Sequence, residues 1–210
     1  MGFSTPACGK KPEQPLIEGR WARRWFSGML RSCLLLALLA LAGCSDPVAN
    51  SRFELTRVES TWSNGRLNVI SEQKLVLSEA ARDALIHGVP LTLQLELVLR
   101  DTGSQTRIGQ ETSSYEIRYL PLSGYYQLTF SDSDEIKTYP RLRHVLAELS
   151  RLNVSVETGV IPAGDYELLA RMSLDQQTMP PPMRLPVLLS AKWQHDTSWT
   201  SWPLQIDPEV

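Results

Sequence analysis

The stretch Leu91-Thr92-Leu93-Gln94-Leu95-Glu96-Leu97-Val98-Leu99-Arg100 carries the clearest structural signal in the chain. A leucine stands at every second position, and most of the residues between the leucines are polar. Successive side chains of a β-strand point to opposite faces, so this alternation predicts a strand with one buried face. A buried face needs a second layer of structure to cover it, and we therefore expect a packed β-sheet protein.

Two hairpins are expected, one on each side of this strand. Residues at about 53–62 and 66–71 are strand-like, and Asn64-Gly65 between them tolerates the positive φ angles of a two-residue hairpin turn. Residues 115–119 and 126–130 alternate in the same way, with a proline and a glycine between them. The sequence thus predicts an antiparallel arrangement of short strands.

Two helices are also predicted. Ser78 is a good N-cap for a short helix with an alanine-rich apolar face, which Gly88 and Pro90 end. From Thr138 to Leu152 apolar residues recur at helical spacing. We expect this second segment to be the main helix, packed on a sheet.

The carboxy-terminal third returns to a strand pattern. Apolar residues alternate over 166–174, and three consecutive prolines from Pro180 then break the chain before strands expected at about 185–195 and 199–206. The predicted fold is mainly β (α+β): an antiparallel β-sandwich-like domain with two helices packed at one side, preceded by a signal peptide. A single domain over residues 53–207 accounts for the pattern.

Composition excludes several classes of protein. The chain has 210 residues, 42% of them hydrophobic and 21% charged, which is ordinary for a globular domain and argues against disorder. The net charge of −2 lacks the basic excess that binding to nucleic acid usually needs. All three cysteines lie in the first 44 residues, so no disulfide framework is expected downstream.

Residues 1–43 have the layout of a signal peptide. Basic residues at positions 20–31 precede an apolar run over 34–42, the order of charged and hydrophobic regions in a secretory signal. This run is too short for an ordinary membrane-spanning helix, which needs about 20 residues. Met29 would by itself open a short, positively charged signal, so we expect translation to begin there and residues 1–28 to be a spurious extension.

The apolar run ends in Leu41-Ala42-Gly43-Cys44, which resembles the lipobox of bacterial lipoproteins. The resemblance implies cleavage before Cys44, acylation of its sulfur and its new amine, and a lipidated tether over 44–52. It also implies a lipid-anchored protein of the cell envelope that faces the periplasm. An Asp directly after the cysteine would favour the inner membrane, and because Ser45 stands there, we expect the outer membrane.

The body of the chain resembles an uncharacterised bacterial family, domain-of-unknown-function family 4390, over about residues 53–206. The residues that carry the resemblance are His87-Gly88-Val89-Pro90-Leu91, Tyr115-Glu116-Ile117-Arg118-Tyr119 with Leu122 and Tyr126, Arg171-Met172-Ser173-Leu174-Asp175, Pro180, Arg184-Leu185-Pro186, Trp193, Ser198-Trp199 and Trp202-Pro203-Leu204. The resemblance supports the β-rich fold and an envelope location. It implies no activity and no catalytic residue.

The histidines of the mature region are His87, His144 and His195, the available bases for nucleophilic catalysis. The run from His195 to Ser198 contains the residue types of a catalytic triad, but neighbours on a strand point to opposite faces and cannot form a relay. Simple structural roles are expected for His87 and His144. We therefore predict no catalytic residues and no enzyme.

Metal and cofactor sites are not indicated. Residues 132–135 have the alternate carboxylates of a calcium loop but lack its glycine and distant glutamate, which favours a solvated turn. No histidine or cysteine pair has zinc spacing, and no glycine-rich phosphate loop occurs. The densest aromatic cluster, Trp193, Trp199 and Trp202, is either part of the core, the favoured interpretation, or an interaction surface.

These observations favour an envelope lipoprotein whose domain is a periplasmic protein-interaction or structural module. Its expected partners are the membrane, through the lipid at the amino terminus, and another envelope protein. One alternative is a carrier that holds a lipid or small ligand in an apolar cavity. Another is a hydrolase with an unrecognised site.

Overall fold

The computed structural model describes residues 52–133 and 135–207. The strands are β1 (Arg52–Ser63), β2 (Arg66–Val76), β3 (Leu91–Asp101), β4 (Arg107–Leu120), β5 (Tyr125–Phe130), β6 (Glu135–Tyr139), β7 (Arg151–Glu157), β8 (Gly164–Leu174) and β9 (Thr200–Ile206). The helices are α2 (Glu79–Ile86), α3 (Leu142–Glu148), α4 (Pro181–Leu189) and the short 3-10 helix η1 (Ala191–Trp193).

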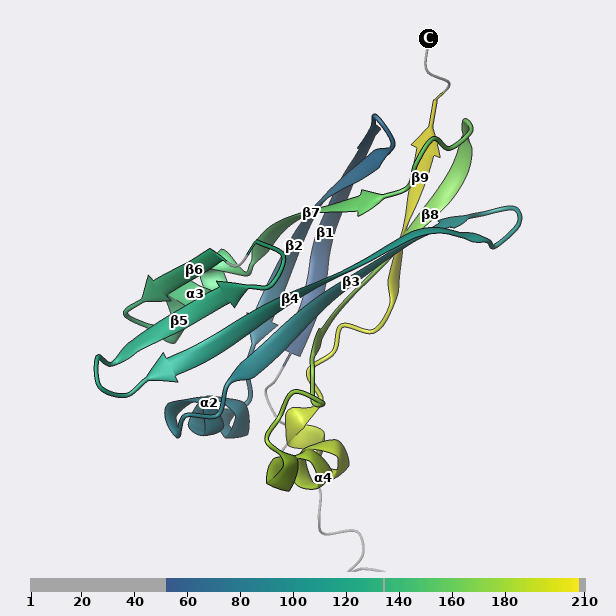
Figure 1. Ribbon diagram of the computed structural model, residues 1–210. Helices are drawn as coiled ribbons and strands as arrows, with labels where there is room; N and C mark the ends of the chain where they lie inside the picture. The colour runs from purple at the N-terminus through teal and green to yellow at the C-terminus, as the bar shows by residue number, and fades with distance from the viewer. Residues whose placement is uncertain (1–51, 134, 208–210) are drawn as a thin grey trace, which may run out of the picture. The chain divides into compact units, whose positions relative to one another are not determined.

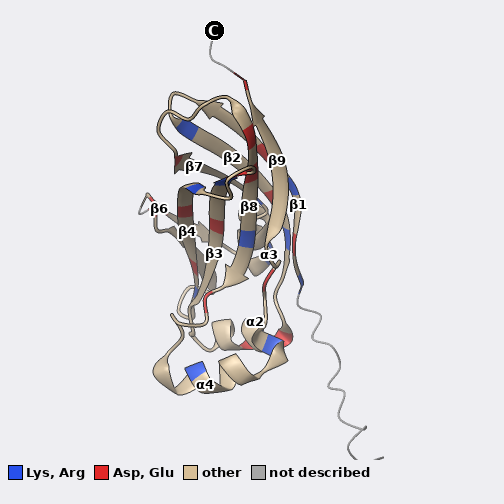
Figure 2. Ribbon diagram, turned by 90° about the vertical axis from the view of Figure 1, so that its right-hand side faces the viewer, with Lys and Arg blue, Asp and Glu red and all other residues tan. Residues whose placement is uncertain are grey.

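The strands form two antiparallel sheets (Figure 1). One sheet has the order β1-β2-β7 and the other the order β6-β5-β4-β3-β8-β9. Apolar side chains from both sheets form one buried core between them. The prediction of a mainly β, antiparallel fold is thus confirmed, and the two layers are visible in Figure 2.

The hairpin predicted at Asn64-Gly65 is present. Asn64 has φ 52° and Gly65 φ 75°, the left-handed conformation that a tight hairpin turn requires. Ser63 pairs with Arg66 directly beside the turn, and Trp62 pairs with Leu67 next to them. The second predicted hairpin is also confirmed, because β4 pairs with β5 through Tyr115 opposite Phe130.

Strand β3 lies inside the larger sheet, between β4 and β8. Its five alternating leucines, Leu91, Leu93, Leu95, Leu97 and Leu99, are all at most 1% exposed. Burying five leucines along one strand removes a large apolar area from water, which explains why this stretch sets the arrangement of the sheet. The opposite face of β3 carries Gln94 and Glu96 into the site described below.

The prediction of a helix over residues 138–152 is wrong in its extent. Residues up to Tyr139 belong to β6, α3 covers only Leu142–Glu148, and Leu152 lies in β7. Pairing with strand β5 on one side and β2 on the other holds both flanks extended. The helix that remains is tied to β6 by a hydrogen bond of 2.8 Å from Lys137 Nζ to Glu148 Oε1.

The strand expected at about 185–195 is also wrong, because this segment forms α4 and η1. Two of the three consecutive prolines occupy the first helical turn, where a missing N–H costs nothing. The described residues therefore contain three α-helices rather than two. Both views place α2 and α4 at the same end of the sheets, where each contacts η1 (Figures 1 and 2).

The strand expected at about 199–206 is confirmed as β9, and the helix capped by Ser78 is confirmed as α2. Ser78 Oγ accepts a hydrogen bond from the backbone N–H of Ala81, as an N-cap does. Across the described residues, none of the helices has the length and apolarity that crossing a membrane requires.

Candidate functional site

A polar groove of about 590 Å³ lies on the face of the larger sheet that points away from the core. Its floor is formed by Gln94 and Glu96 of β3 and by Arg171 and Ser173 of β8. The loops 175–177 and 194–198 form its walls, and Leu188 of α4 lines its edge. We call this set of residues the polar groove.

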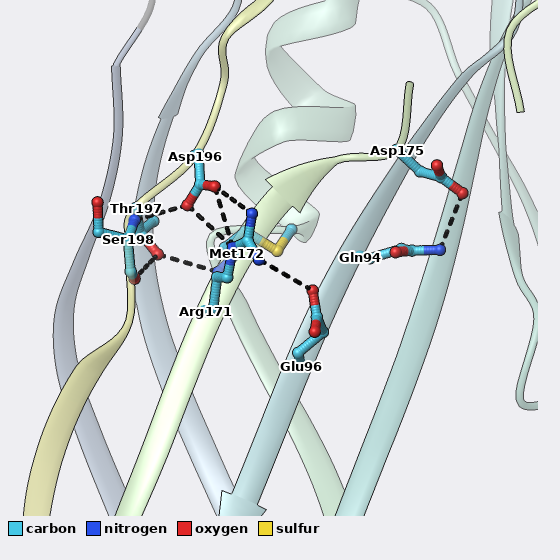
Figure 3. A network of polar contacts seen from close by, with 8 residues as sticks. All are labelled: Gln94, Glu96, Arg171, Met172, Asp175, Asp196, Thr197 and Ser198. Atoms are coloured by element: carbon cyan, nitrogen blue, oxygen red, sulfur yellow. Dashed lines mark hydrogen bonds and ion pairs between the residues drawn. The ribbon is translucent and has the colours of Figure 1, made fainter. Parts of the chain in front are cut away.

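Arg171 is the central charge of the polar groove (Figure 3). Strand pairing places it opposite Glu96, and its Nη1 lies 3.9 Å from Glu96 Oε1. Its Nε donates to Asp196 at 3.0 Å, and its Nη2 forms a further ion pair with the same carboxylate. Hydrogen bonding to Asp196, reinforced by the negative charges of Asp196 and Glu96, raises the pKa of Arg171 above its ordinary value.

The loop that carries Asp196 is fastened to β8 by two hydrogen bonds between Thr197 and the backbone of Met172. Thr197 Oγ1 accepts from the N–H of Met172 at 3.0 Å, and the N–H of Thr197 donates to the carbonyl of Met172 at 3.0 Å. Asp196 also accepts a hydrogen bond from the N–H of Ser198 at 2.6 Å. The guanidinium carbon of Arg171 lies 5.9 Å from the ring centroid of Trp199, within the range of a cation–π interaction.

The opposite wall is built on Asp175. Gln94 Nε2 donates to Asp175 Oδ2 at 3.0 Å (Figure 3). The N–H of Gln177 donates to Asp175 Oδ1 at 2.8 Å. The backbone N–H of Asp175 bonds to the carbonyl of Thr92 at 2.8 Å. Both walls are therefore held in place by bonds within the domain, which gives the polar groove a preformed shape.

Three carboxylates and one guanidinium line the polar groove, together with the side-chain amides of four glutamines. Arg171 already interacts with Glu96 and Asp196, so its charge is largely compensated. The groove as a whole thus has an excess of negative charge and of hydrogen-bond acceptors. It suits a ligand or peptide segment that presents hydrogen-bond donors or positive charge.

His195 borders the groove but is only 2% exposed. Its Nε2 accepts a hydrogen bond of 2.9 Å from the backbone N–H of Ser78, and its ring centroid lies 5.2 Å from that of Phe53. Burial lowers the pKa of His195. Because the neighbouring Asp196 pairs with Arg171, the three residues of a Ser-His-Asp relay do not converge here.

The other residues singled out from the sequence lie apart from the groove. His87 is exposed at the end of α2, with its Nδ1 2.7 Å from the carbonyl of Asp83. His144 is half-buried on α3 beside Arg143. Of the suggested calcium loop, Asp134 lies outside the described residues. Within residues 52–133 and 135–207, no group of three or more His, Cys, Asp or Glu side chains is placed to hold a metal ion.

The three tryptophans are placed differently from one another. Trp193 is buried, and Trp202 is partly buried and packs against the core. Trp199 is 45% exposed and reaches the rim of the polar groove through its contact with Arg171. A role for the cluster as an interaction surface stays a prediction.

Sequence reasoning missed the polar groove. Its floor depends on the pairing of β3 with β8, whose residues Glu96 and Arg171 are far apart in the chain. In β3 and β8, polar residues alternate with buried ones, which indicates that each strand has an outer face. No local sequence pattern, however, indicates which strands are neighbours in the sheet. The lipobox residues Leu41, Ala42, Gly43 and Cys44 lie outside the described residues.

The fold and the groove define an antiparallel β domain of two sheets with a polar recess on one outer face. A family model described as "Domain of unknown function (DUF4390)" matches residues 50–203, and the chain belongs to that family. The resemblance in the body of the sequence is thereby confirmed. Neither the curated proteins nor the solved structures contained a match.

Proposed function

We propose that the protein is an envelope lipoprotein whose DUF4390 domain binds another envelope protein on its periplasmic side. Residues 1–43 are its signal peptide, Cys44 is its acylated first residue and the residues from Cys44 to the start of β1 at Arg52 are its tether. The outer membrane is the favoured location. The domain acts by binding and carries no cofactor or catalytic residue of its own.

The lipobox Leu41-Ala42-Gly43-Cys44 is the observation that supports the lipid anchor. It follows an apolar run and a basic segment, so motif and position agree. One acyl chain holds a protein to a bilayer only marginally, whereas several make the attachment lasting. Strand β1 begins at Arg52, soon after Cys44, so a short tether would keep the domain close to the bilayer.

The polar groove supports binding to a protein partner. Its walls are fixed by hydrogen bonds that the carboxylates of Asp175 and Asp196 accept, so little ordering is needed when a partner enters. The excess of carboxylates selects a partner segment that presents lysine, arginine or amide donors. A polar lining of this kind suits such a segment better than an acyl chain, which favours the interaction module over the lipid carrier.

Inhibition of processing tests the lipoprotein half of the proposal. Globomycin blocks the lipoprotein signal peptidase, so it should cause the full-length precursor to accumulate in cells. Cys44→Ser should give the same unprocessed species without the drug. Cys33→Ser, a matched change within the same segment, should be processed normally. Normal processing of Cys44→Ser, or in the presence of globomycin, would refute the proposal.

Site-specific crosslinking tests the binding half. A photoreactive amino acid at Gln177, an exposed residue of the groove wall, should crosslink to one defined envelope protein. The same amino acid at Gln110, an exposed glutamine of the same sheet outside the groove, is the control. The adduct should weaken in Asp175→Asn. Equal adducts from both positions, or none from Gln177, would argue against the groove as the binding site.

A further inference from the structure

Helix α4 exposes an apolar face to solvent. Leu185 is 71%, Leu188 57% and Leu189 87% exposed, although leucine usually lies in the interior. Residues three and four apart lie on the same side of a helix, so these side chains form one surface. The other side of α4 is fixed to the domain through Val187, which is 1% exposed. The apolar face is therefore held outward by the fold.

The charged side chains on the segment that carries this face are all basic. Residues 178–194 contain Arg184 and Lys192, both exposed, and no acidic residue. Figure 2 shows basic but no acidic colour on α4. Arg184 Nε donates to the carbonyl of Met179 at 2.9 Å, which holds its stem along the start of the helix. Apolar side chains beside basic ones are the composition of helices that bind anionic lipid surfaces.

The position of α4 relative to the start of β1 indicates which kind of partner covers its apolar face. Phe53, the second residue of β1, packs on His195, and η1 just before His195 contacts α4. Phe53 also pairs with Leu75, close to the start of α2. The chain therefore enters the domain at the end that carries α2 and α4. At this same end, Ile86 of α2 adds a further apolar side chain that is 50% exposed.

The length of the chain before β1 limits how far this end can lie from the anchor. Cys44 and Arg52 are separated by eight residue steps, which span at most about 29 Å even when fully extended. This step rests on the function proposed above, in which Cys44 carries acyl chains in a bilayer. The end of the domain with α4 then stays within reach of the membrane surface.

We propose that the apolar face of α4 docks on the phospholipid bilayer to which Cys44 is anchored. Leu185, Leu188 and Leu189 enter the interface between headgroups and acyl chains, and Arg184 and Lys192 lie against anionic headgroups. The acyl chains hold the protein on the membrane, and α4 sets the orientation of the domain. The hairpin turn at Asn64-Gly65, at the other end of β1, points away from the bilayer.

Environment-sensitive labelling of the full-length, processed protein tests this proposal. Leu189→Cys and Val160→Cys are matched probe sites: their side chains are 87% and 93% exposed. Val160 follows Gly159, whose N–H bonds to the carbonyl of Gly65 at the opposite end of the domain. In the processed protein Cys44 is acylated, so the introduced cysteine is the only thiol that reacts with the dye.

The labelled proteins are reconstituted into vesicles of phosphatidylethanolamine and phosphatidylglycerol. A dye at Leu189→Cys should show a blue-shifted emission and severalfold stronger quenching by a lipid-borne quencher than a dye at Val160→Cys. Vesicles of phosphatidylcholine alone should weaken the quenching at position 189. Equal quenching at both positions in lipid-modified protein overturns the docking proposal and leaves the lipoprotein proposal intact.

Two further results distinguish membrane docking from an unmodified Cys44 and from pairing of α4 with a second copy of the chain. The mass of the Cys44 peptide is measured on the same sample, and an unmodified cysteine overturns both proposals. A blue shift at position 189 that occurs in detergent and grows with protein concentration shows that α4 pairs with a second copy, which overturns membrane docking. Leu189→Asp changes an exposed side chain and should therefore preserve thermal stability. Because it places a charge on the docking face of α4, it should make the orientation of the domain relative to the vesicle surface less defined.

Discussion

The imidazole of His195 accepts, through Nε2, a hydrogen bond of 2.9 Å from the backbone N–H of Ser78, which lies 117 positions earlier in the chain. Ser78 also caps α2 through its hydroxyl. One neutral histidine therefore joins the loop of the polar groove to the start of a helix and to Phe53 at the start of β1. Only the unprotonated Nε2 can accept this bond.

The stability of the domain should fall in mild acid because of His195. Burial lowers the pKa of His195 below its ordinary value of 6.5. As the pH falls, the unfolded chain therefore binds a proton at this histidine before the folded protein does. The contribution of neutral His195 to the free energy of unfolding is complete above about pH 6.5 and is lost as the pH falls toward its pKa in the folded protein. Because a single proton is involved, the slope of the free energy of unfolding against pH should be at most about 1.4 kcal/mol per pH unit.

Urea unfolding at a series of pH values checks this prediction. His195→Gln offers an acceptor without a titrating ring, so its unfolding free energy should depend less on pH between 6.5 and 5. His87→Gln removes an exposed histidine and should leave the pH dependence of the wild-type protein in place. Identical pH profiles for wild type and His195→Gln would contradict the assignment.

Gly109 should not tolerate a side chain. A Cβ at this position of β4 would lie 2.8 Å from the carbonyl oxygen of Glu157 and 3.1 Å from Val156 Cγ1, where β7 passes over the larger sheet. A backbone atom cannot move away cheaply, so Gly109→Ala should cost roughly 1–3 kcal/mol. Gly103→Ala, whose Cβ would have 3.6 Å to its nearest neighbour, is the control in the same unfolding measurement. Equal free energies of unfolding for Gly109→Ala and Gly103→Ala would show that β4 and β7 do not approach each other this closely.

The two faces of β3 should respond differently to truncation. Leu97 is fully buried between the sheets, and Leu97→Ala should cost about 2–5 kcal/mol of unfolding free energy. Its neighbour Val98 lies on the outer face and is only partly buried, so Val98→Ala should cost about 1 kcal/mol or less. Denaturant titration measures both. Similar losses would mean that both faces of the strand are equally packed.

The residue after Cys44 should decide the membrane in which the protein resides. The wild-type protein, with Ser45, should fractionate with the outer membrane on a density gradient. Ser45→Asp should shift it to the inner membrane, because an Asp directly after the acylated cysteine favours retention there. Ser51→Asp makes the same chemical change farther along the tether and should cause no shift. If Ser45→Asp and Ser51→Asp distribute alike, the sorting prediction fails.

The sequence predicted the elements whose signals are local. The Asn64-Gly65 turn, the alternating leucines of β3 and the Ser78 cap all follow from the residues at those positions. The spacing of Leu152 from Leu149 fits a helix, and the predicted helix over 138–152 is wrong at this residue. Pairing with Ser71 of β2 instead places Leu152 in a strand that alternates buried and exposed residues. Tertiary pairing thus overrode a helical pattern.

The polar groove could not be derived from the sequence because its residues meet only through long-range pairing. Glu96 and Arg171 lie opposite each other because β8 returns to the side of β3 after four intervening strands. Asp196 reaches Arg171 through a loop that follows α4, a segment in which a strand was expected. The exposed apolar face of α4 is not predictable from the sequence for the same reason, because leucines in an expected strand are assigned to the core.

Mass spectrometry of the amino-terminal peptide of the protein purified from membranes tests whether Cys44 is the lipid-modified first residue. We expect a peptide that begins at Cys44 and carries a diacylglyceryl group on its sulfur and an acyl chain on its amine. A peptide that begins before Cys44, or an unmodified Cys44 in the membrane-purified protein, would contradict the lipid anchor and the orientation inferred from it.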